Sequence, residues 1–472
     1  MIKRPLNAIA ALCGGTVLND NRGDAAIVGV SINTRTIQPG MLFVPIRGER
    51  VDGHDYVGAA LEAGAGGALW ERSKAVPDVL AEAPLVLVDD TVAALQRLAA
   101  NYRDELDLRV VGVTGSNGKT TTKDMVAAVL SGTYRVHKTV GNLNNHLGLP
   151  LTVLELDESY DAVVLEMGMS EFGEIDFLTR LAKPDVAIIT NIGDSHLEQL
   201  GSRAGIAQAK LEIVAGLRPG GLLIMNGDEP LLAEGIRSAR LPDGVEVQTF
   251  GLEDGSRWVA EHIGVDATSS RFDVKGEAGL QRVELPAAGR HNVSNALAAI
   301  AAATRLGVPA AVIRQGFAGL KLTAMRIEAG RAANGAMVLN DAYNASPTSV
   351  RAAIDLVAGL TGYRRKWLVL GDMLELGPQE LELHGEVGAY VTPAKADAVL
   401  AFGTLSRHTA AAAAKQFAAD GGEERVRAFD DKGALAEWLL ARLAPEDLVL
   451  VKGSRGMRME DIVHALQREA QR

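Results

Sequence analysis

The middle of the chain alternates between continuous apolar runs and stretches with helical periodicity. The apolar runs fall at residues 110–113, 162–165, 186–190 and 222–225. Strands that are apolar at every position are typical of a parallel sheet buried on both faces. Residues 257–286 change to a period of two, which predicts an antiparallel flap, and a helix is expected at 291–305. The pattern therefore predicts an open α/β domain over residues 85–313.

The segments on either side have strands of their own. Residues 1–84 show short strands at 26–32 and 41–46 and a helix of small residues at 57–65, which predicts a small N-terminal α/β domain. Residues 314–472 alternate again, with strands at 367–370, 398–402, 426–429 and 448–451. This second alternation predicts a Rossmann-like C-terminal α/β domain. It contains no G-x-G-x-x-G motif, so the sequence does not support dinucleotide binding there.

Composition narrows the classes of function. The chain of 472 residues has 48 basic and 59 acidic side chains, a net charge of −11, and so offers no broad positive surface for nucleic acid. The single cysteine, Cys13, excludes an internal disulfide and a thiolate metal cluster. The short apolar stretch after Lys3 and Arg4 fits an opening helix ended by Gly14 better than a signal peptide. Because no run approaches about 20 apolar residues, we expect a cytoplasmic protein without membrane insertion.

The most informative segment is V-V-G-V-T-G-S-N-G-K-T-T-T-K-D-M, residues 110–125. An apolar strand runs into three glycines, and Lys119, Thr120 and a helical pattern follow directly. This layout binds phosphate through backbone N–H groups and a helix N-terminus, while the lysine neutralises the anion and the hydroxyl reaches Mg²⁺. The spacing G-x-x-G-x-x-G-K-T differs from the usual Walker pattern. A plain glycine-rich turn is the alternative, but lysine and threonine directly after the glycines favour a phosphate loop.

Two further side chains follow strands of the same predicted sheet. Glu166 comes at the end of the strand at 162–165, and His196 lies just past the strand at 186–190. Because ligands bind at the carboxyl ends of the strands in such sheets, both side chains should lie near the phosphate loop. Together with the Thr120 hydroxyl they could hold Mg²⁺. The alternative is that Glu166 caps a helix and His196 is a surface residue.

Lys210 interrupts an apolar helical stripe that includes Ile206 and Leu217. One interpretation is that its aliphatic stem is buried and its ammonium reaches water. The other is that burial lowers the pKa of the amine, which then takes up CO₂ as a carbamate and supplies a carboxylate for a second Mg²⁺. The helical pattern alone leaves both interpretations open.

Four segments gather polar residues. Asn142, Asn144 and Asn145 crowd a glycine-bounded loop, which is either a turn or a substrate contact. The segments 291–296 and 339–349 could cap a nucleotide at a domain joint or could be ordinary Asx-turns and helix caps. The segment V-K-G-S-R-G at 451–456 places cations before a helix, which suits a carboxylate or phosphate group.

Together these motifs resemble the Mur ligases. The order G-x-x-G-x-x-G-K-T-T, E-M-G, N-I-G-x-x-H, A-K-x-E-I, H-N-x-x-N-A, D-x-Y-N-A-x-P and V-K-G-S-R runs through all three segments. Residues 31–57 are similar to the uridine-nucleotide domain of the members that add D-alanyl-D-alanine to UDP-N-acetylmuramoyl-tripeptide. Residues 368–377, with Glu382 and His384, are similar to their third domain. Asn33 stands where these members usually have aspartate, and the D-N-P-R motif of the diaminopimelate-adding members is absent.

The resemblance implies that residues 1–84 bind the UDP-linked substrate, residues 85–313 bind ATP and residues 314–472 form the ligase domain. The residues implied to bind ATP are Gly115, Ser116, Asn117, Gly118, Lys119, Thr120, Thr121, Asn295, Arg326, Asp341 and Asn344. Of these, Asn295, Arg326 and Asp341 would contact adenine, γ-phosphate and ribose. Thr120 and Glu166 would hold one Mg²⁺, and His196 and carbamylated Lys210 a second. Lys119, Glu166, His196 and Lys210 are thus the implied catalytic residues.

The resemblance also implies the acceptor sites and the reaction. Ser31, Thr34 and Arg35 would lie near the UDP group, Asn142 and Asn145 near the muramoyl peptide, and Lys452, Ser454 and Arg455 toward the incoming dipeptide. The implied protein is a monomeric, cytoplasmic ligase of peptidoglycan synthesis that works through an acyl phosphate. One alternative is a folylpolyglutamate-type ligase, which lacks the N-terminal segment. The other is a P-loop nucleotide switch, which hydrolyses ATP without a small amine.

Overall fold

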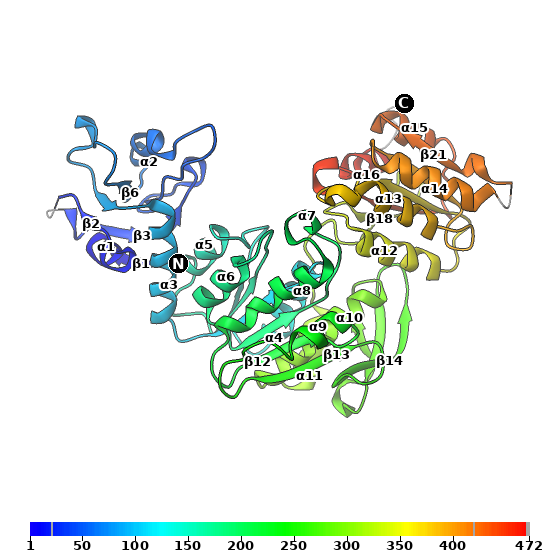
Figure 1. Cartoon of the computed structure of the whole chain (residues 1–472), viewed down its shortest axis with the longest axis horizontal. Helices are drawn as coiled ribbons and strands as arrows, with labels where there is room; N and C mark the ends of the chain where they lie inside the picture. Colours follow the sequence, from blue (N-terminus) through cyan, green and yellow to red (C-terminus); the bar gives the residue numbers. More distant parts are fainter. Residues whose placement is uncertain (20–21, 419–420, 469–472) are drawn as a thin grey trace.

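The structure is a computed structural model that describes residues 1–19, 22–418 and 421–468. Three α/β parts follow one another along the chain, each with its own large sheet. Figure 1 shows them as an open arc, with the N-terminal and C-terminal parts at its two ends and the middle part between them. The three-part α/β fold expected from the sequence is confirmed. Within the described ranges, no helix combines the length and the apolar character needed to cross a membrane.

The N-terminal part contains a five-stranded sheet and a two-stranded one. The larger sheet has the order β2 (Thr16–Val17), β7 (Leu85–Val88), β6 (Gly67–Glu71), β5 (Leu42–Phe43) and β4 (Val30–Ser31). In the smaller sheet β1 (Lys3–Pro5) pairs with β3 (Ala26–Val28). A single strand at 26–32 is therefore wrong: Gly29, with a φ of +82°, breaks it, and its halves join different sheets.

The helices of this part begin near the expected residues. Helix α1 (Leu6–Cys13) ends at Gly14, which takes the left-handed conformation at a φ of 72° that glycine adopts without steric cost. Helix α2 (Val57–Glu62) is shorter than the stretch 57–65 expected from its small residues. The strand expected at 41–46 is likewise reduced to β5.

The middle part is built on a nine-stranded sheet. Its order is β16 (Val283–Leu285), β15 (Ser270–Val274), β14 (Trp258–Val265), β13 (Glu246–Gly251), β12 (Leu222–Asn226), β11 (Val186–Ile189), β8 (Arg109–Thr114), β10 (Ala162–Glu166) and β9 (Val136–Lys138). The pairs from β9 to β14 are parallel, and β14, β15 and β16 pair antiparallel. The predicted antiparallel flap is thus the far edge of the same sheet, because β14 joins β13.

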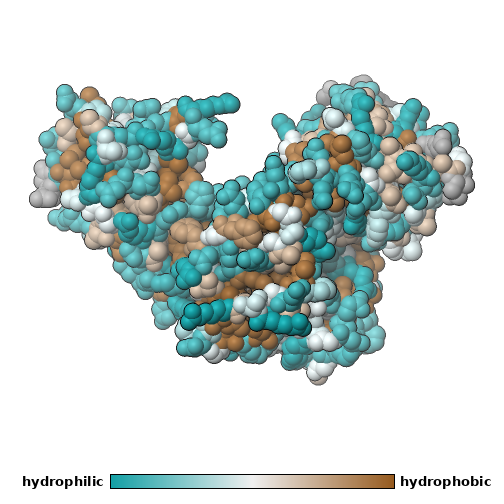
Figure 2. Space-filling model, viewed as in Figure 1, coloured by the Kyte–Doolittle hydropathy of each residue, from teal (hydrophilic) through white to brown (hydrophobic). Residues whose placement is uncertain are grey.

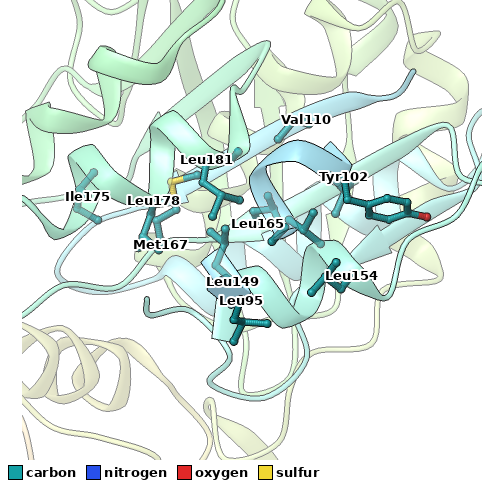
Figure 3. Packing of buried hydrophobic residues seen from close by; sticks show 14 of the residues in the cluster. Leu95, Tyr102, Val110, Leu149, Leu154, Leu165, Met167, Ile175, Leu178 and Leu181 are labelled. Atoms are coloured by element: carbon teal, nitrogen blue, oxygen red, sulfur yellow. The ribbon is translucent and has the colours of Figure 1, made fainter. Parts of the chain in front are cut away.

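Helices cover both faces of this sheet. On one face, α4 (Lys119–Leu130), α10 (Arg290–Arg305) and α11 (Ala310–Ala318) pack together over the buried strands. On the other face lie α5 (Gly148–Leu154), α6 (Glu174–Ala182) and α8 (Arg203–Leu211), with the long helix α3 (Thr91–Glu105). Helix α3 also packs on α1, so one continuous core joins the N-terminal and middle parts. Figure 3 shows Leu95 and Tyr102 of α3 beside Leu149, Leu165 and Leu178 in this core.

Truncation of this core tests its contribution to stability. We expect Leu165→Ala to lower the free energy of unfolding by about 2–5 kcal/mol, because Leu165 has 0% exposure and its loss leaves a cavity. Urea unfolding followed by circular dichroism measures the change. The control Leu381→Ala, at a side chain that is 47% exposed, should change the value by less than about 0.5 kcal/mol. Equal effects of the two changes would contradict the assignment of this core.

The C-terminal part has a six-stranded sheet. Its order is β17 (Glu328–Arg331), β18 (Met337–Asp341), β22 (Leu448–Lys452), β19 (Lys366–Gly371), β20 (Ala398–Phe402) and β21 (Val426–Phe429), with β17 antiparallel to β18 and the other pairs parallel. Helices α12 (Pro347–Gly359), α13 (Glu380–Tyr390) and α14 (Ser406–Ala418) cover one face, and α15 (Lys432–Leu440) and α16 (Glu460–Gln467) the other. All four strands expected from the sequence are present within a residue at each end.

Candidate functional site

The loop between β8 and α4 needs its glycines. Gly115 has a φ of +148°, and a Cβ at this position would collide with Oγ1 of Thr190. Gly118 has a φ of +79°, and its Cβ would lie 2.8 Å from Oδ1 of Asn295. Both a left-handed backbone and close neighbours therefore exclude larger residues. The glycines bring the loop against β11 and α10, and its backbone leads into the N-terminus of α4 as a phosphate cradle does.

The segment after β11 fixes the shape of this loop. Asn191 Oδ1 accepts a hydrogen bond from the backbone N–H of Asn117 at 2.9 Å, and Thr190 Oγ1 donates to the carbonyl of Asn117 at 2.6 Å. In the sequence this segment stood out only for His196, and the roles of Thr190 and Asn191 in holding the loop were not predicted. The adjacency of β8 and β11 in one parallel sheet was the signal that could have found them.

Lys119 projects over the loop that precedes it. Its Nζ donates to the carbonyl of Gly115 at 2.8 Å and lies 3.4 Å from that of Ser116. Burial lowers the pKa of Lys119, and the neighbouring Glu166 opposes this shift. A buried cation gains most from an anion placed beside it, because the low dielectric strengthens their attraction.

Glu166 is the last residue of β10, as expected from the sequence, and its side chain is buried. Asn144 Nδ2 donates to Oε1 of Glu166 at 2.9 Å, whereas Oε2 is buried and has no hydrogen-bond partner among the described residues. Asn144 was noted in the sequence as part of a turn or a substrate contact, but its link to Glu166 was missed. It orients the carboxylate so that one oxygen remains available.

His196 and Lys210 lie close enough to Lys119 to respond to its charge. Burial, followed by the charges of Lys119 and Lys210, lowers the pKa of His196 to about 4. Burial and then the charge of Lys119 lower the pKa of Lys210 well below its ordinary value. Both groups therefore favour their neutral forms, which are the forms that bind a metal ion or react with CO₂. Lys210 is only 3% exposed, so its aliphatic stem is buried, as both interpretations expect.

Unpartnered polar atoms surround the loop. The buried atoms without a hydrogen-bond partner in the described part of the chain include Ser116 Oγ, Asn117 Nδ2, Glu166 Oε2 and Arg326 Nε. Such atoms are rare in native proteins and each needs a partner such as a ligand or an ion. The same region has an excess of cationic and imidazole groups over carboxylates. No group of three or more His, Cys, Asp or Glu side chains suited to a metal ion occurs in the described residues, and the expected set contains only two residues of those types.

The C-terminal part forms a second wall of the candidate site. Nη2 of Arg326 donates to Oγ1 of Thr120 at 3.1 Å, and its guanidinium lies 3.9 Å from the centre of the Tyr343 ring. Ser346, which caps α12, donates to Oδ1 of Asn117 at 3.1 Å. Residues more than 200 positions apart thus meet at the phosphate loop. Ser346 is thus a helix cap, one of the two interpretations of its segment, and it also contacts the loop.

Asp341 and Lys452, expected at different subsites, form one buried ion pair. Lys452 Nζ lies 2.6 Å from Oδ2 of Asp341 and also donates to the carbonyl of Asn344 at 3.0 Å. The pair meets because β18 and β22 are neighbours with Asp341 opposite Lys452. Burial is the main cause that lowers the pKa of the adjacent His291 to about 4. His291 belongs to the H-N-x-x-N-A motif but is not among the site residues predicted from the sequence.

The other residues expected at the dipeptide site have partners within the C-terminal part. Ser454 is buried and accepts a hydrogen bond from the N–H of Leu374 at 2.9 Å. Arg455 pairs with Glu460 at 2.8 Å. Glu375, in the loop after β19, lies 3.8 Å from Nδ1 of His196, so this loop faces the phosphate loop.

The residues expected near the UDP-linked substrate belong to the other side of the molecule. Ser31, Thr34 and Arg35 lie in or beside the turn after β4, where Asn33 Oδ1 accepts from the N–H of Arg35 at 3.0 Å. Asparagine caps this turn as aspartate would, so the departure at position 33 keeps the local structure. Figure 2 shows a broad hollow between the N-terminal and C-terminal parts, above the middle part.

The two asparagines expected near the muramoyl peptide are exposed. Asn145 Oδ1 accepts from the N–H of Gly148 at 2.9 Å and so also stabilises the start of α5. Asn142 lies in the loop before it, two residues from Asn144. The loop thus contributes a buried contact to Glu166 from one residue and exposed amides from the others.

Comparison with known proteins identifies the family. The signature described as "Mur ligase middle domain" matches residues 113–303, "Mur ligase, glutamate ligase domain" matches residues 325–455, and "Mur ligase family, catalytic domain" matches residues 26–103. The chain belongs to the Mur ligase family. The resemblance noted in the sequence is confirmed, and the motifs quoted for it lie in all three matched regions or beside them.

The chain aligns over nearly its whole length with named ligases and with solved structures of this family. The UDP-N-acetylmuramoyl-tripeptide--D-alanyl-D-alanine ligase of Bacillus subtilis (strain 168) is 47% identical over 99% of this chain and 99% of its own. The crystal structure of MurF from Acinetobacter baumannii matches with a TM-score of 0.88 at 30% identity, over 99% of this chain and 100% of that one. The MurF ligase from Thermotoga maritima in complex with ADP matches with a TM-score of 0.80 at 29% identity, over 93% and 97%.

Proposed function

We propose that this protein is an ATP-dependent ligase that joins D-alanyl-D-alanine to UDP-N-acetylmuramoyl-tripeptide in peptidoglycan synthesis. The observation that carries the proposal is that Glu166, Arg326, His196 and Lys210 all lie close enough to Lys119, beside a phosphate loop, for their charges to interact. This excess of positive and neutral nitrogen groups suits a triphosphate next to a second anion. The named relatives at 47% identity and the related ADP complex support both the reaction and ATP as its substrate.

The reaction must activate a carboxylate, which is a poor electrophile. An oxygen of the tripeptide's terminal carboxylate forms a bond to the γ-phosphorus of ATP, and the bond from that phosphorus to the β–γ bridging oxygen breaks, releasing ADP. The amine of D-alanyl-D-alanine then attacks the acyl carbon, phosphate leaves with the C–O electron pair, and the nitrogen gives up its extra proton to water or to the departing phosphate. Lys119 and Arg326 lower the repulsion between the two anions in the first step, because both cations are preorganised around the loop.

The donor set fits Mg²⁺. Glu166 offers a buried oxygen that lacks a partner among the described residues, Thr120 offers a hydroxyl on the same side of the loop, and a pKa of about 4 keeps His196 neutral at pH 7. We propose that Thr120 and Glu166 hold one ion and that His196 and carbamylated Lys210 hold a second. When bound, Mg²⁺ neutralises phosphate charge and aligns the γ-phosphoryl group. The residues themselves set the positions: Asn144 orients Glu166, and burial lowers the pKa of Lys210, which favours its neutral amine.

The remaining substrate contacts are assigned by position. Ser31, Thr34 and Arg35 in the N-terminal part would bind the UDP group, so the muramoyl peptide would extend across the hollow toward Asn142 and Asn145. Asn295 lies under Gly118 and Asp341 lies on the C-terminal wall, where they would bind adenine and ribose. We place the dipeptide contacts on Lys452, Ser454 and Arg455, each of which also has a partner within the C-terminal part. All these residues come from one chain, and we propose a monomer.

Release of ADP tests the function. We expect purified protein to release ADP from ATP and Mg²⁺ with UDP-N-acetylmuramoyl-tripeptide only when D-alanyl-D-alanine is added, with one ADP for each amide bond formed. Substituting D-alanine or L-alanyl-L-alanine is the control for the second amine. ADP release that needs no amine would indicate a nucleotide switch instead. Dependence on glutamate and a folate, with no response to the UDP substrate, would indicate the folylpolyglutamate type.

A further inference from the structure

Asp124 is a buried carboxylate that the proposed reaction does not use. It lies on α4, one helical turn after Thr120, and its side chain has 0% exposure. Lys138 Nζ approaches its Oδ1 at 2.7 Å and Lys123 Nζ at 3.4 Å. The other oxygen, Oδ2, faces the opposite way and accepts two hydrogen bonds from a single residue, Thr323.

The bonds to Thr323 tie the phosphate-loop helix to the chain that enters the C-terminal part. The backbone N–H and Oγ1 of Thr323 each lie 2.8 Å from Oδ2 of Asp124, across 199 positions of sequence. Three residues later, Arg326 Nη2 reaches Oγ1 of Thr120 at 3.1 Å. Residues four apart on a helix lie on the same face. The segment at residues 323–326 is therefore held to one face of α4 at two successive points.

The backbone around Arg326 is strained. Met325 has a φ of +61° and Ile327 a φ of +54°, a region that side-chain-bearing residues rarely adopt and β-branched residues avoid most strongly. Such conformations persist where surrounding contacts hold them in place. The contacts here are Thr323 on Asp124 before the strained residues, and Glu328 after them, which accepts the N–H of Met325 at 3.1 Å and starts β17.

We propose that Asp124 is a positioning residue for Arg326: by holding Thr323, it fixes the strained segment so that the guanidinium stays over the phosphate loop. Without this attachment, residues 323–327 are free to relax and Arg326 loses its place between Thr120 and Tyr343. The positive charges of Lys123 and Lys138 secure Asp124 from the other side, so its carboxylate stays ionised although burial opposes this. This inference rests on the proposed function for the role of Arg326 toward the γ-phosphate.

The test is a double-mutant cycle between Thr323 and Arg326. Thr323→Val removes the hydroxyl bond to Asp124 and keeps the shape of the side chain and the backbone N–H bond. We expect it to lower kcat about tenfold, the size of losing one hydrogen bond to a charged group. Thr323→Ser retains the hydroxyl and should restore most of the activity. In an Arg326→Ala background, Thr323→Val should cause no further loss, because the residue it positions is gone.

Two outcomes would overturn the proposal. One is wild-type kcat for Thr323→Val. The other is a loss in the double variant equal to the product of the two single losses, which is expected if Thr323 has a separate structural role. Thermal unfolding of each variant checks the fold, and Asp124→Ala provides a second removal of the same contact. The cycle is repeated on ATP affinity alone, so coupling is measurable even if the wild-type protein shows no ADP release dependent on D-alanyl-D-alanine.

Discussion

Replacing Lys119 with alanine should lower turnover by about a hundred- to a thousandfold, the scale found when one preorganised electrostatic group is removed from a reaction site. The ammonium lies over the loop that would hold the β- and γ-phosphates, within 2.8 Å of the Gly115 carbonyl. Because Lys119 is buried, its positive charge is unfavourable when no anion is near. The same burial strengthens its attraction to an anion that binds beside it. The measurement is ADP release at saturating substrates, with circular dichroism to verify the fold.

A matched lysine of the same part of the chain serves as the control for Lys119. Lys275 is 51% exposed and pairs with Asp254 on the surface, at the edge of the nine-stranded sheet. Exposed ion pairs contribute about 0–1 kcal/mol to stability, so Lys275→Ala should leave turnover unchanged. Near-wild-type turnover of Lys119→Ala would reject the assignment of the phosphate loop.

Replacing Lys210 with methionine should lower turnover by about a hundredfold or more, because loss of a proposed metal ligand should cost at least the ten- to hundredfold typical of the residues that orient such ligands. Methionine fits the apolar stripe of α8, where Ile206 is also buried, so the fold should be kept. If Lys210 carries a carbamate, wild-type activity should fall in CO₂-depleted buffer and return with bicarbonate. A ¹³C carbamate signal from labelled bicarbonate should be present in the wild type and absent in Lys210→Met.

The pH dependence of this carbamate has a definite sign. Only the neutral amine reacts with CO₂, and burial lowers the pKa of Lys210 well below that of an exposed lysine. Carbamate formation should therefore increase as pH rises through this lowered pKa and be lost at lower pH, where the amine is protonated. Gln208→Met, on the exposed side of the same helix, is the control and should keep the bicarbonate response. Full activity of Lys210→Met, or no response of the wild type to bicarbonate, would contradict the hypothesis.

The candidate site was predictable to the extent that its residues lie at strand ends. Glu166 and His196 follow strands of one parallel sheet, and parallel strands bring their carboxyl ends to one edge. The residues that hydrogen-bond to Glu166 and to the phosphate loop could not be predicted from strand ends. Asn144 reaches Glu166 and Asn191 reaches Asn117 through side chains whose direction depends on loop conformation, and loops of polar residues have many conformations of similar free energy.

The strand boundaries, too, were only partly predictable from the sequence. Strand β20 has the bounds given by its apolar run, because burial on both faces requires apolar residues along the whole strand. The stretch 26–32 has equally apolar residues, yet Gly29 divides it between two sheets. Local composition could not indicate this, since the division depends on which neighbours the two halves meet.

The sequence by itself determined the glycine-rich loop and the three α/β parts, because glycine conformation and hydrophobic periodicity are local properties of the chain. Only the tertiary structure decided which distant residues meet: Asp341 with Lys452 across 111 positions, Asp124 with Thr323 across 199, and Thr120 with Arg326 across 206. These contacts depend on how whole helices and sheets pack. The free energy that selects this packing comes from hundreds of buried atoms, so no single position in the sequence reveals it.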